Sequence, residues 1–226
     1  MKSKLNNIFV GFDQKEAVAY HTFVQSLIES SSIPLSITPL SENNLNIYDE
    51  KHTDGTNKFT YSRFLVPFLM NFTGWAIYFD GDMICVNDIK KLMDHIDENV
   101  AVKVVKHSYK TKQSKKYFGQ KNENYPRKNW SSVILWNCSH PKNKILTPEF
   151  IERNDGAFLH RFKWLKDNEI GDLDKKWNWL AIEYEEINDP NLIHYTLGTP
   201  CFKEYKNTAF SNYWAFAYER LKQGFN

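Results

Sequence analysis

The chain has 226 residues, which is enough to bury one substantial core but few for two independently folded domains. Hydrophobic residues make up 42% and charged residues 25%, a balance typical of globular proteins and unlike that of disordered chains. The formal net charge of +2 gives no reason to expect a polyanionic partner such as nucleic acid. We therefore predict a single domain over residues 1–226 and no nucleic-acid partner.

Cysteine usage and hydropathy bear on the cellular compartment. Cys85, Cys138 and Cys201 form an odd set without paired or metal-type spacing, which favours free thiols in a reducing compartment. The opening segment lacks an apolar run typical of a signal peptide, and no later stretch is long enough to span a bilayer. These features predict a cytoplasmic protein.

The first elements follow from short-range patterns. Residues 8–10, Ile-Phe-Val, indicate a buried strand. Asp13 and Glu16 have the spacing of a capping box and predict the start of a helix with an apolar face. Leu35 and Ile37 alternate with polar residues after Pro34, which predicts a second strand.

The middle of the chain continues the alternation of helices and strands. We predict a helix over 61–70, a strand over 75–79 that ends abruptly in charged residues, and a short helix capped by Asn87 and running through Met93. Valines at alternate positions over 100–104 predict the next strand. Helices between successive strands favour right-handed crossovers and a parallel sheet covered on both faces.

The second half departs from this regular order. Residues 132–136 indicate another buried strand, Thr147-Pro148 has the signature of a helix start, and an amphipathic helix is predicted from Ser211 onward. We therefore predict the α/β class, with a Rossmann-like, mainly parallel but mixed sheet flanked by helices.

Two carboxylates follow the strand over 75–79. Asp80 and Asp82 lie at its carboxyl end, which is the edge where open α/β sheets bind ligands. Residues two apart in an extended chain point the same way, so both carboxylates can reach one cation, and Gly81 between them adds no side chain. Hard oxygen donors favour Mg²⁺ or Mn²⁺, with phosphate oxygens completing the coordination. The pattern predicts a metal-assisted reaction of a phosphate compound.

Two alternatives compete with this interpretation. Asp-Gly-Asp is also a common surface turn, but residues 83–86 continue as an apolar run, so the carboxylates interrupt a buried path. An Asp-x-Asp phosphohydrolase would form an aspartyl phosphate. Its motif normally lies on the first strand with Thr or Val two residues after the second Asp, whereas Ile84 occupies that position here.

Basic and aromatic residues gather in two further segments. Lysines and arginines crowd between Lys103 and Lys128 among several aromatic residues, and the C-terminal segment carries Tyr213, Trp214 and Phe216. A solvated loop and core packing are the ordinary interpretations. An acceptor-binding surface for an acidic glycan or lipid, or contact with a membrane surface, is the alternative.

Several motifs in order resemble glycosyltransferase family 8, whose members have the GT-A fold and include glycogenin and bacterial lipopolysaccharide glycosyltransferases. The similar segments are a first strand, an Arg-bearing helix, the Asp-x-Asp strand, a small-residue strand ending in Asn, a Trp-Asn segment and a His-containing phosphate motif. In this sequence they read IFVGFD, FTYSRFLVP, YFDGDMICVNDI, NWSSVILWN, LDKKWN and IHYTLGTPCF. The resemblance implies a nucleotide-binding half over 1–105 and an acceptor- and sugar-binding half over 106–226.

The resemblance also implies roles for individual residues. Asp80, Asp82 and His194 would bind the metal, and an imidazole beside two carboxylates shifts the preference toward Mn²⁺. The remaining implied contacts are with the nucleotide, the phosphates and the sugar of the donor. They fall on Gly11, Asp13, Arg63, Gly81, Ser131, Ser132, Asn137, Gly198 and Thr199. Each of these has an ordinary alternative, such as a helix cap for Asp13, an ion pair for Arg63 or a core histidine for His194.

Two departures from the family pattern concern the reacting end of the sugar. The family usually has Asp-Gln-Asp before the Trp-Asn segment, but the corresponding stretch here is near His160-Arg161-Phe162. The phosphate motif normally carries a Lys, whereas this chain has Thr199-Pro200-Cys201. Arg161 is our candidate for the catalytic group near the sugar, and Lys203 or Arg161 for the missing lysine.

The resemblance predicts a retaining hexosyltransferase that depends on Mn²⁺ or Mg²⁺, uses a UDP-sugar and acts on a glycan or glycolipid acceptor such as lipopolysaccharide. The cytoplasmic location would then be peripheral to the inner face of a membrane, with the oligomeric state left open. Two other classes remain as alternatives: a non-catalytic module that binds nucleotide sugars, and a nucleotidyltransferase of similar fold.

Overall fold

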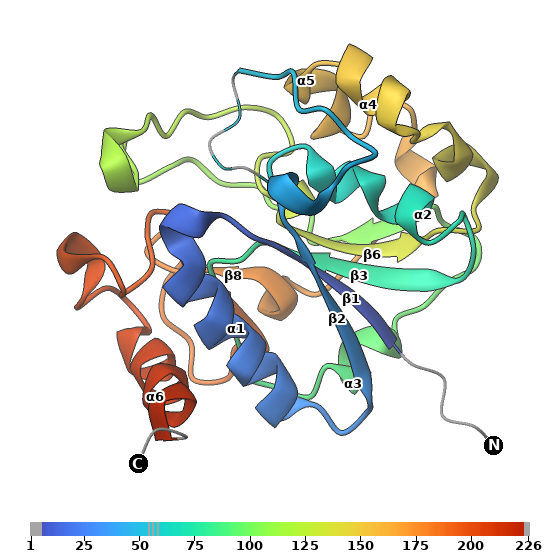
Figure 1. Ribbon diagram of the computed structural model, residues 1–226. Coiled ribbons are helices and arrows are strands. Elements are labelled where there is room, and N and C mark those ends of the chain that lie inside the picture. Colours follow the sequence, from blue (N-terminus) through green and yellow to red (C-terminus); the bar gives the residue numbers. More distant parts are fainter. Residues whose placement is uncertain (1–5, 54, 56, 58, 224–226) are drawn as a thin grey trace.

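The computed structural model describes residues 6–223 except 54, 56 and 58. The ends of the predicted domain, 1–5 and 224–226, therefore lie outside the described residues. Two sheets organise the fold, and Figure 1 shows the larger one between two groups of helices. The strands are β1 (Asn6–Gly11), β2 (Leu35–Leu40), β3 (Trp75–Phe79), β4 (Met83–Cys85), β5 (Val102–Val104), β6 (Val133–Asn137), β7 (Ile170–Asp172), β8 (Trp179–Leu180) and β9 (Leu192–His194).

The larger sheet has the order β2-β1-β3-β6-β5-β7. All neighbouring pairs are parallel except those that β6 makes with β3 and with β5. One strand therefore runs against five. This arrangement confirms the predicted α/β class with a mainly parallel, mixed sheet flanked by helices.

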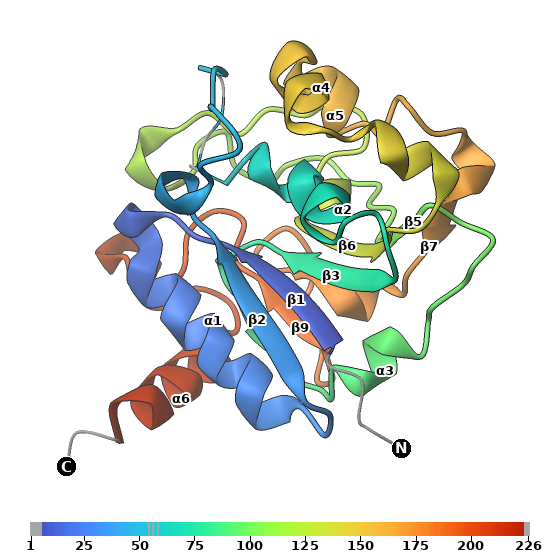
Figure 2. The same cartoon turned by 45° about the vertical axis from the view of Figure 1, so that its right-hand side comes forward.

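The α-helices lie on both faces of this sheet, as the 45° turn between Figures 1 and 2 makes clear. Helices α1 and α6 pack side by side near the second sheet, and α2, α4 and α5 cover the opposite face. The helices are α1 (Ala17–Ser30), α2 (Val66–Leu69), α3 (Lys90–Met93), α4 (Pro148–Arg153), α5 (Gly156–Leu159) and α6 (Ser211–Lys222).

Strand alternation divides the core into two layers. Ile8 and Val10 face the layer that contains α1, whereas Phe9 between them faces the layer that contains α2 and α4. Ile77 and Tyr78 on β3 divide in the same way, because successive side chains of a strand point to opposite faces. A third cluster packs α6 against the smaller sheet.

The smaller sheet positions the second half of the site. Its order is β4-β9-β8, with β4 antiparallel to β9. Met83 pairs with His194 in this ladder, and the backbone N–H of Tyr195 donates to the carbonyl of Asp82 at 3.0 Å. The ladder therefore holds Asp82 beside His194, although more than 100 positions separate them in the chain.

Two predicted helix starts need correction. Asp13 caps a 3₁₀ turn by accepting from the backbone N–H of Lys15 at 2.9 Å, but Glu16 does not complete a capping box because its carboxylate is bound elsewhere. The short helix predicted after Asn87 begins at Lys90, and Asp88 accepts from the Lys90 N–H at 3.0 Å. The Thr147 cap is confirmed, since its hydroxyl accepts from the N–H of Phe150.

None of the helices in the described part of the chain combines the length and the apolar composition needed to traverse a bilayer. The three cysteines are all unpaired: Cys85 and Cys138 are buried, and Cys201 is partly buried. The predicted free thiols are therefore present in the structure.

Candidate active site

A cleft of about 420 Å³ opens at the carboxyl end of β3. It lies where β3 meets the antiparallel β6, and both sheets contribute to its walls. Apart from Gly156 and Ala157, its lining is polar or aromatic: Asn57, Thr60, Tyr61, Arg63, Asp80, Asp82, Lys116, Tyr117, Lys121, Glu123, Tyr125, Asn129, Ser131, Ser132, His160, Arg161, His194 and Thr196.

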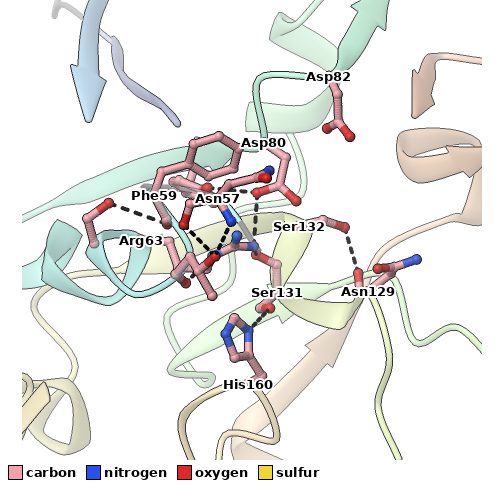
Figure 3. Close-up of polar contacts among 12 residues, drawn as sticks. Asn57, Phe59, Arg63, Asp80, Asp82, Asn129, Ser131, Ser132 and His160 are labelled. Carbon is pink, nitrogen blue, oxygen red and sulfur yellow. Dashed lines mark hydrogen bonds and ion pairs between the residues drawn. The ribbon is translucent and has the colours of Figure 1, made fainter. Parts of the chain in front are cut away.

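Asp80 is held by the protein through one of its two oxygens. Its Oδ1 accepts from the Tyr78 hydroxyl at 2.7 Å and lies 2.9 Å from Arg63 Nη1, as Figure 3 shows for the Arg63 pair. Burial raises the pKa of Asp80, and the Arg63 charge offsets this only in part. Because Oδ1 is engaged, Oδ2 remains for a ligand, and it lies 4.0 Å from His194 Nε2.

Arg63 is itself buried, with only 6% of its surface exposed. Its guanidinium donates to the backbone carbonyls of Thr60 at 2.8 Å and Ser131 at 2.9 Å, and it lies over the Tyr78 ring. The arginine is therefore committed to a buried ion pair with Asp80 and to the loop before β6.

Asp82 and His194 form the other half of the cluster. Asp82 Oδ1 lies 3.2 Å from His194 Nε2, and the two side chains are 9% and 3% exposed. Burial alone would raise the pKa of Asp82, but the neighbouring imidazole outweighs it, so the pKa is lowered. Among the described residues, no donor makes a hydrogen bond to Asp82 Oδ1. A buried carboxylate oxygen in this state is costly unless a cation approaches it.

Asn178 fixes the orientation of the His194 ring. Its Nδ2 donates to Ser132 Oγ at 2.8 Å and to the Asn129 carbonyl at 3.3 Å, which orients its Oδ1 toward His194 Nδ1 at 2.9 Å. An amide oxygen is only an acceptor, so Nδ1 carries a proton. Nε2 is therefore the ring nitrogen that faces the two carboxylates, and it is the atom that would ligate a metal there.

The donor set fits a divalent cation. One oxygen each from Asp80 and Asp82 and a ring nitrogen of His194 lie within 4.8 Å of one another. Two carboxylates and an imidazole suit Mn²⁺ better than Mg²⁺, which prefers oxygen ligands alone. The Asp82 oxygen that lacks a donor among the described residues and the ring orientation that Asn178 imposes both fit a divalent cation at this position.

The predicted serines face the same cleft from the start of β6. Ser131 Oγ lies 2.7 Å from His160 Nδ1, and Ser132 Oγ donates to the Asn129 carbonyl at 2.7 Å, both visible in Figure 3. Burial holds the pKa of His160 well below its usual range, so the ring is neutral. Arg161 lines the cleft beside His160.

Two predicted glycines serve close packing around the cleft. A Cβ on Gly81 would lie 2.5 Å from the carbonyl oxygen of Gly11, and one on Gly11 would lie 2.8 Å from the Tyr78 hydroxyl. Real Cβ atoms do not approach so closely, so both positions exclude any side chain. The end of β1 can therefore press directly on the loop that carries Asp80 and Asp82.

Other predicted residues lie outside the lining of this cleft. Asp13 is buried at its 3₁₀ turn, Gly198 packs on the Tyr205 ring, and the hydroxyl of the fully buried Thr199 lies 2.8 Å from Cys201 Sγ. Lys203, considered for the missing phosphate-binding lysine, is exposed and is not among the lining residues.

The prediction for Asn137 needs correction. It pairs with Trp75 at the far end of β3, whereas Val133 pairs with Phe79 beside Asp80. Four residues of strand separate the two ends by about 13 Å. The Asn137 amide instead donates to the Val100 carbonyl at 3.2 Å. Because β6 is antiparallel, its first residues and not its last approach the cleft.

Comparison with known proteins agrees with this geometry. The model of glycosyl transferase family 8 matches residues 4–201. The chain belongs to glycosyl transferase family 8. Protein CDI from Arabidopsis thaliana is 42% identical over 216 residues, which cover 92% of this chain and 83% of that protein.

Solved structures confirm the GT-A fold of this family 8 chain. It matches the bifunctional glycosyltransferase WbbM with a TM-score of 0.66 and 13% identity, over 96% of this chain but 50% of that one. GlyE of Streptococcus pneumoniae gives 0.62 and 14%, over 97% and 62%. The galactosyltransferase LgtC, solved with donor and acceptor sugar analogues, gives 0.56 and 10%, over 96% of each chain. The chain thus spans about half of WbbM.

Sequence reasoning missed several groups of this family 8 site. Tyr78 lies two residues before Asp80, so strand alternation could have placed both on one side. Asn178 was predicted only as part of the Trp-Asn segment, with no role of its own, although it joins Ser132 to His194. His160 lies in the stretch that takes the place of the family's Asp-Gln-Asp, and Lys116 lies in the basic segment between Lys103 and Lys128, but neither was singled out as a cleft residue.

Glu16 is a further buried acid near the cluster. It is 7% exposed and accepts from the Tyr117 hydroxyl at 2.5 Å. Burial, reinforced by the Asp82 charge, raises the pKa of Glu16 to about 8. The pKa of Glu16 is 4.5 as its ordinary value and about 8 in the folded protein. Between these two values the folded state keeps a proton on Glu16 that the unfolded chain has released, so the free energy of unfolding falls as the pH rises from about 4.5 to about 8.

Replacing Glu16 with Gln should therefore stabilise the family 8 chain at high pH. We expect the free energy of unfolding of Glu16→Gln to match the unaltered protein near about pH 5 and to exceed it by about 2–4 kcal/mol near about pH 9. Urea unfolding at a series of pH values measures this. Glu185→Gln, at a side chain that is 93% exposed, is the control. If the free energies of unfolding of Glu16→Gln and the unaltered protein differed by the same amount at every pH, the prediction would be contradicted.

Proposed function

We propose that this protein is a metal-dependent, retaining hexosyltransferase that uses a UDP-sugar. One observation carries the proposal: Asp80, Asp82 and His194 converge in the cleft of a family 8 fold and leave a buried carboxylate oxygen that no described residue donates to. Retention follows the family resemblance, and the donor class follows the cleft, whose serine and arginine side chains suit a polar ligand.

Asp80, Asp82 and His194 are the proposed metal ligands, with Mn²⁺ preferred over Mg²⁺ for the reason given above. A divalent cation held there would supply the positive charge that stabilises a departing diphosphate. Arg63 opposes the effect of burial on Asp80 and occupies its Oδ1, which leaves Oδ2 facing the cluster, and Asn178 orients the His194 ring. These two are positioning residues, since the structure commits both to protein partners.

We place the sugar of the donor against Ser131, Ser132 and Arg161. Ser131 is oriented by the neutral His160 ring, and Arg161 lines the cleft within the stretch that, by the family resemblance, takes the place of Asp-Gln-Asp. The Arg161 Nε atom is buried and makes no hydrogen bond with a described residue, so it is available to a hydroxyl or an anionic group. The nucleoside is proposed to lie near the end of β1, where Gly11 and Asp13 were predicted to contribute.

The proposed acceptor is a glycan or glycolipid such as lipopolysaccharide. The support is the lysine-rich segment between Lys103 and Lys128, in which Phe118 is 63% exposed. Phe216 on α6 is 67% exposed. Basic and aromatic side chains of this kind suit the surface of an anionic membrane, and they favour a cytoplasmic protein at the inner face.

A panel of UDP-hexoses tests the function. With Mn²⁺, we expect the purified protein to release UDP from one donor, faster when a glycan acceptor is present, and to stop when EDTA is added. Proton NMR of the product then reports the anomeric configuration. Binding of UDP without release from any donor would favour the non-catalytic module instead. Release of pyrophosphate from a nucleoside triphosphate would favour a nucleotidyltransferase.

A further inference from the structure

A hairpin-like arm reaches over one end of the cleft. We define the arm as residues 114–122. Lys115 and Lys121 form an antiparallel bridge, the N–H of Lys116 donates to the Gln120 carbonyl at 2.8 Å, and the N–H of Asn122 donates to the Ser114 carbonyl at 2.8 Å. The arm belongs to the yellow-green loop that projects away from the sheet at the left of Figure 1.

The arm is fastened to the body of the protein through Tyr117. The Tyr117 N–H donates to the Leu197 carbonyl at 2.8 Å, and its hydroxyl contacts both Glu16 Oε1 and Asn57 Oδ1. Its ring stacks on Phe202 at 5.0 Å. These contacts hold the backbone next to Lys116 to two separate parts of the chain, one near Glu16 and Asn57 and the other near Leu197 and Phe202.

Lys116 lines the cleft together with Asp82 and His194. Among the described residues, no carboxylate lies within ion-pair distance of Lys116. The side chain is only partly buried. A lysine without an ion-pair partner beside an acidic cluster is suited to bind a further anion.

The other cations of the cleft are less suited to this role. Arg63 is committed to Asp80, and Lys121 lies 4.0 Å from Glu123 and is 87% exposed. Arg161 is next to His160, whose ring contacts Ser131, and so belongs to the part of the cleft in which we place the sugar. A cation bound to Asp80 and Asp82 would balance those two charges alone, so a diphosphate needs additional positive charge from the protein.

We propose that Lys116 binds the diphosphate of the sugar donor and so supplies, from the arm, the charge that the segment Thr199-Pro200-Cys201 lacks. This inference rests on the proposed function. It also couples the arm to donor binding, because Lys116 and the tethered Tyr117 are adjacent.

Calorimetric titration with UDP and with uridine, each in the presence of Mn²⁺, tests the assignment. Lys116→Met should weaken UDP binding by about 10-fold or more, since an ionic hydrogen bond to phosphate is lost. Uridine lacks the diphosphate, and its affinity should stay within about twofold. Lys116→Arg should retain most of the UDP affinity. Lys115→Met removes the adjacent exposed lysine and should leave both affinities unchanged.

Salt dependence gives a second readout. The UDP affinity of the unaltered protein should fall more steeply with added KCl than that of Lys116→Met, because one screened charge pair is missing in the variant. If Lys116→Met and Lys115→Met bound UDP equally well, the proposal that Lys116 in particular binds the diphosphate would be overturned. Equal losses for UDP and uridine would overturn it too, because they would mark a structural role for the arm. If the unaltered protein bound no UDP, the proposed function and this inference would both fall.

Discussion

Asp82→Asn is expected to abolish the metal-dependent binding of UDP, with a loss of affinity of at least about 100-fold. The change removes a ligand from the Asp80, Asp82 and His194 cluster, and even the loss of residues that only support metal ligands costs about 10- to 100-fold. The fold should persist, because the substitution keeps the side-chain shape and removes one of two crowded negative charges.

Calorimetric titration of UDP with and without Mn²⁺ measures this effect, and thermal unfolding monitors the fold. Asp172→Asn is the matched control, since Asp172 is an aspartate at the end of β7 whose side chain is 69% exposed and lies 3.4 Å from Lys106. It should leave UDP affinity within about twofold. Unaltered UDP affinity in Asp82→Asn would be incompatible with the proposed metal site.

Of the variants considered, Arg63→Met should lower the free energy of unfolding the most. The variant leaves Asp80 buried without its ion-pair partner and removes the hydrogen bonds to the carbonyls of Thr60 and Ser131. Breaking one side of a buried pair costs about 3–5 kcal/mol, because the remaining charge is uncompensated. Urea unfolding in EDTA measures the free energy without help from a bound cation.

The double variant Arg63→Met/Asp80→Asn separates charge from packing. Neutralising Asp80 should restore part of the lost stability, since the uncompensated charge is gone while the hydrogen bonds to the carbonyls remain absent. Arg127→Met is the control: Arg127 also contacts a carboxylate and a ring, but its partner Asp167 is 88% exposed, so a smaller loss is expected. Equal losses in Arg63→Met and Arg127→Met would contradict a special role for the buried pair.

Local patterns predicted much of the fold because they depend on neighbours in the chain. The apolar run of β3 and its end at Asp80 are properties of a few consecutive residues, and so is the Thr147 cap. The exceptions have causes that lie far away in the chain. Glu16 leaves its expected capping box because burial beside Tyr117 competes for its carboxylate, and that partner lies 101 positions away.

The direction of β6 illustrates what such patterns do not contain. The buried run over residues 133–137 has the same composition whether the strand runs parallel or antiparallel. Direction decides which end reaches the cleft, and the antiparallel pairing with β3 brings Ser131 and Ser132 to Asp80 while it carries Asn137 away. The family resemblance placed all three residues in one site, and only the pairing separates them.

By itself, the sequence determined the α/β class, the elements around the first strands and the pair of carboxylates at a strand end, because each depends on residues within about ten positions of one another. Only the tertiary structure decided the rest of the site. The ladder between β4 and β9 places His194 against Asp82, and Asn178 orients its ring. Pairing between distant strands sets these contacts, and its free energy comes from burial shared over the whole core and not from any local motif.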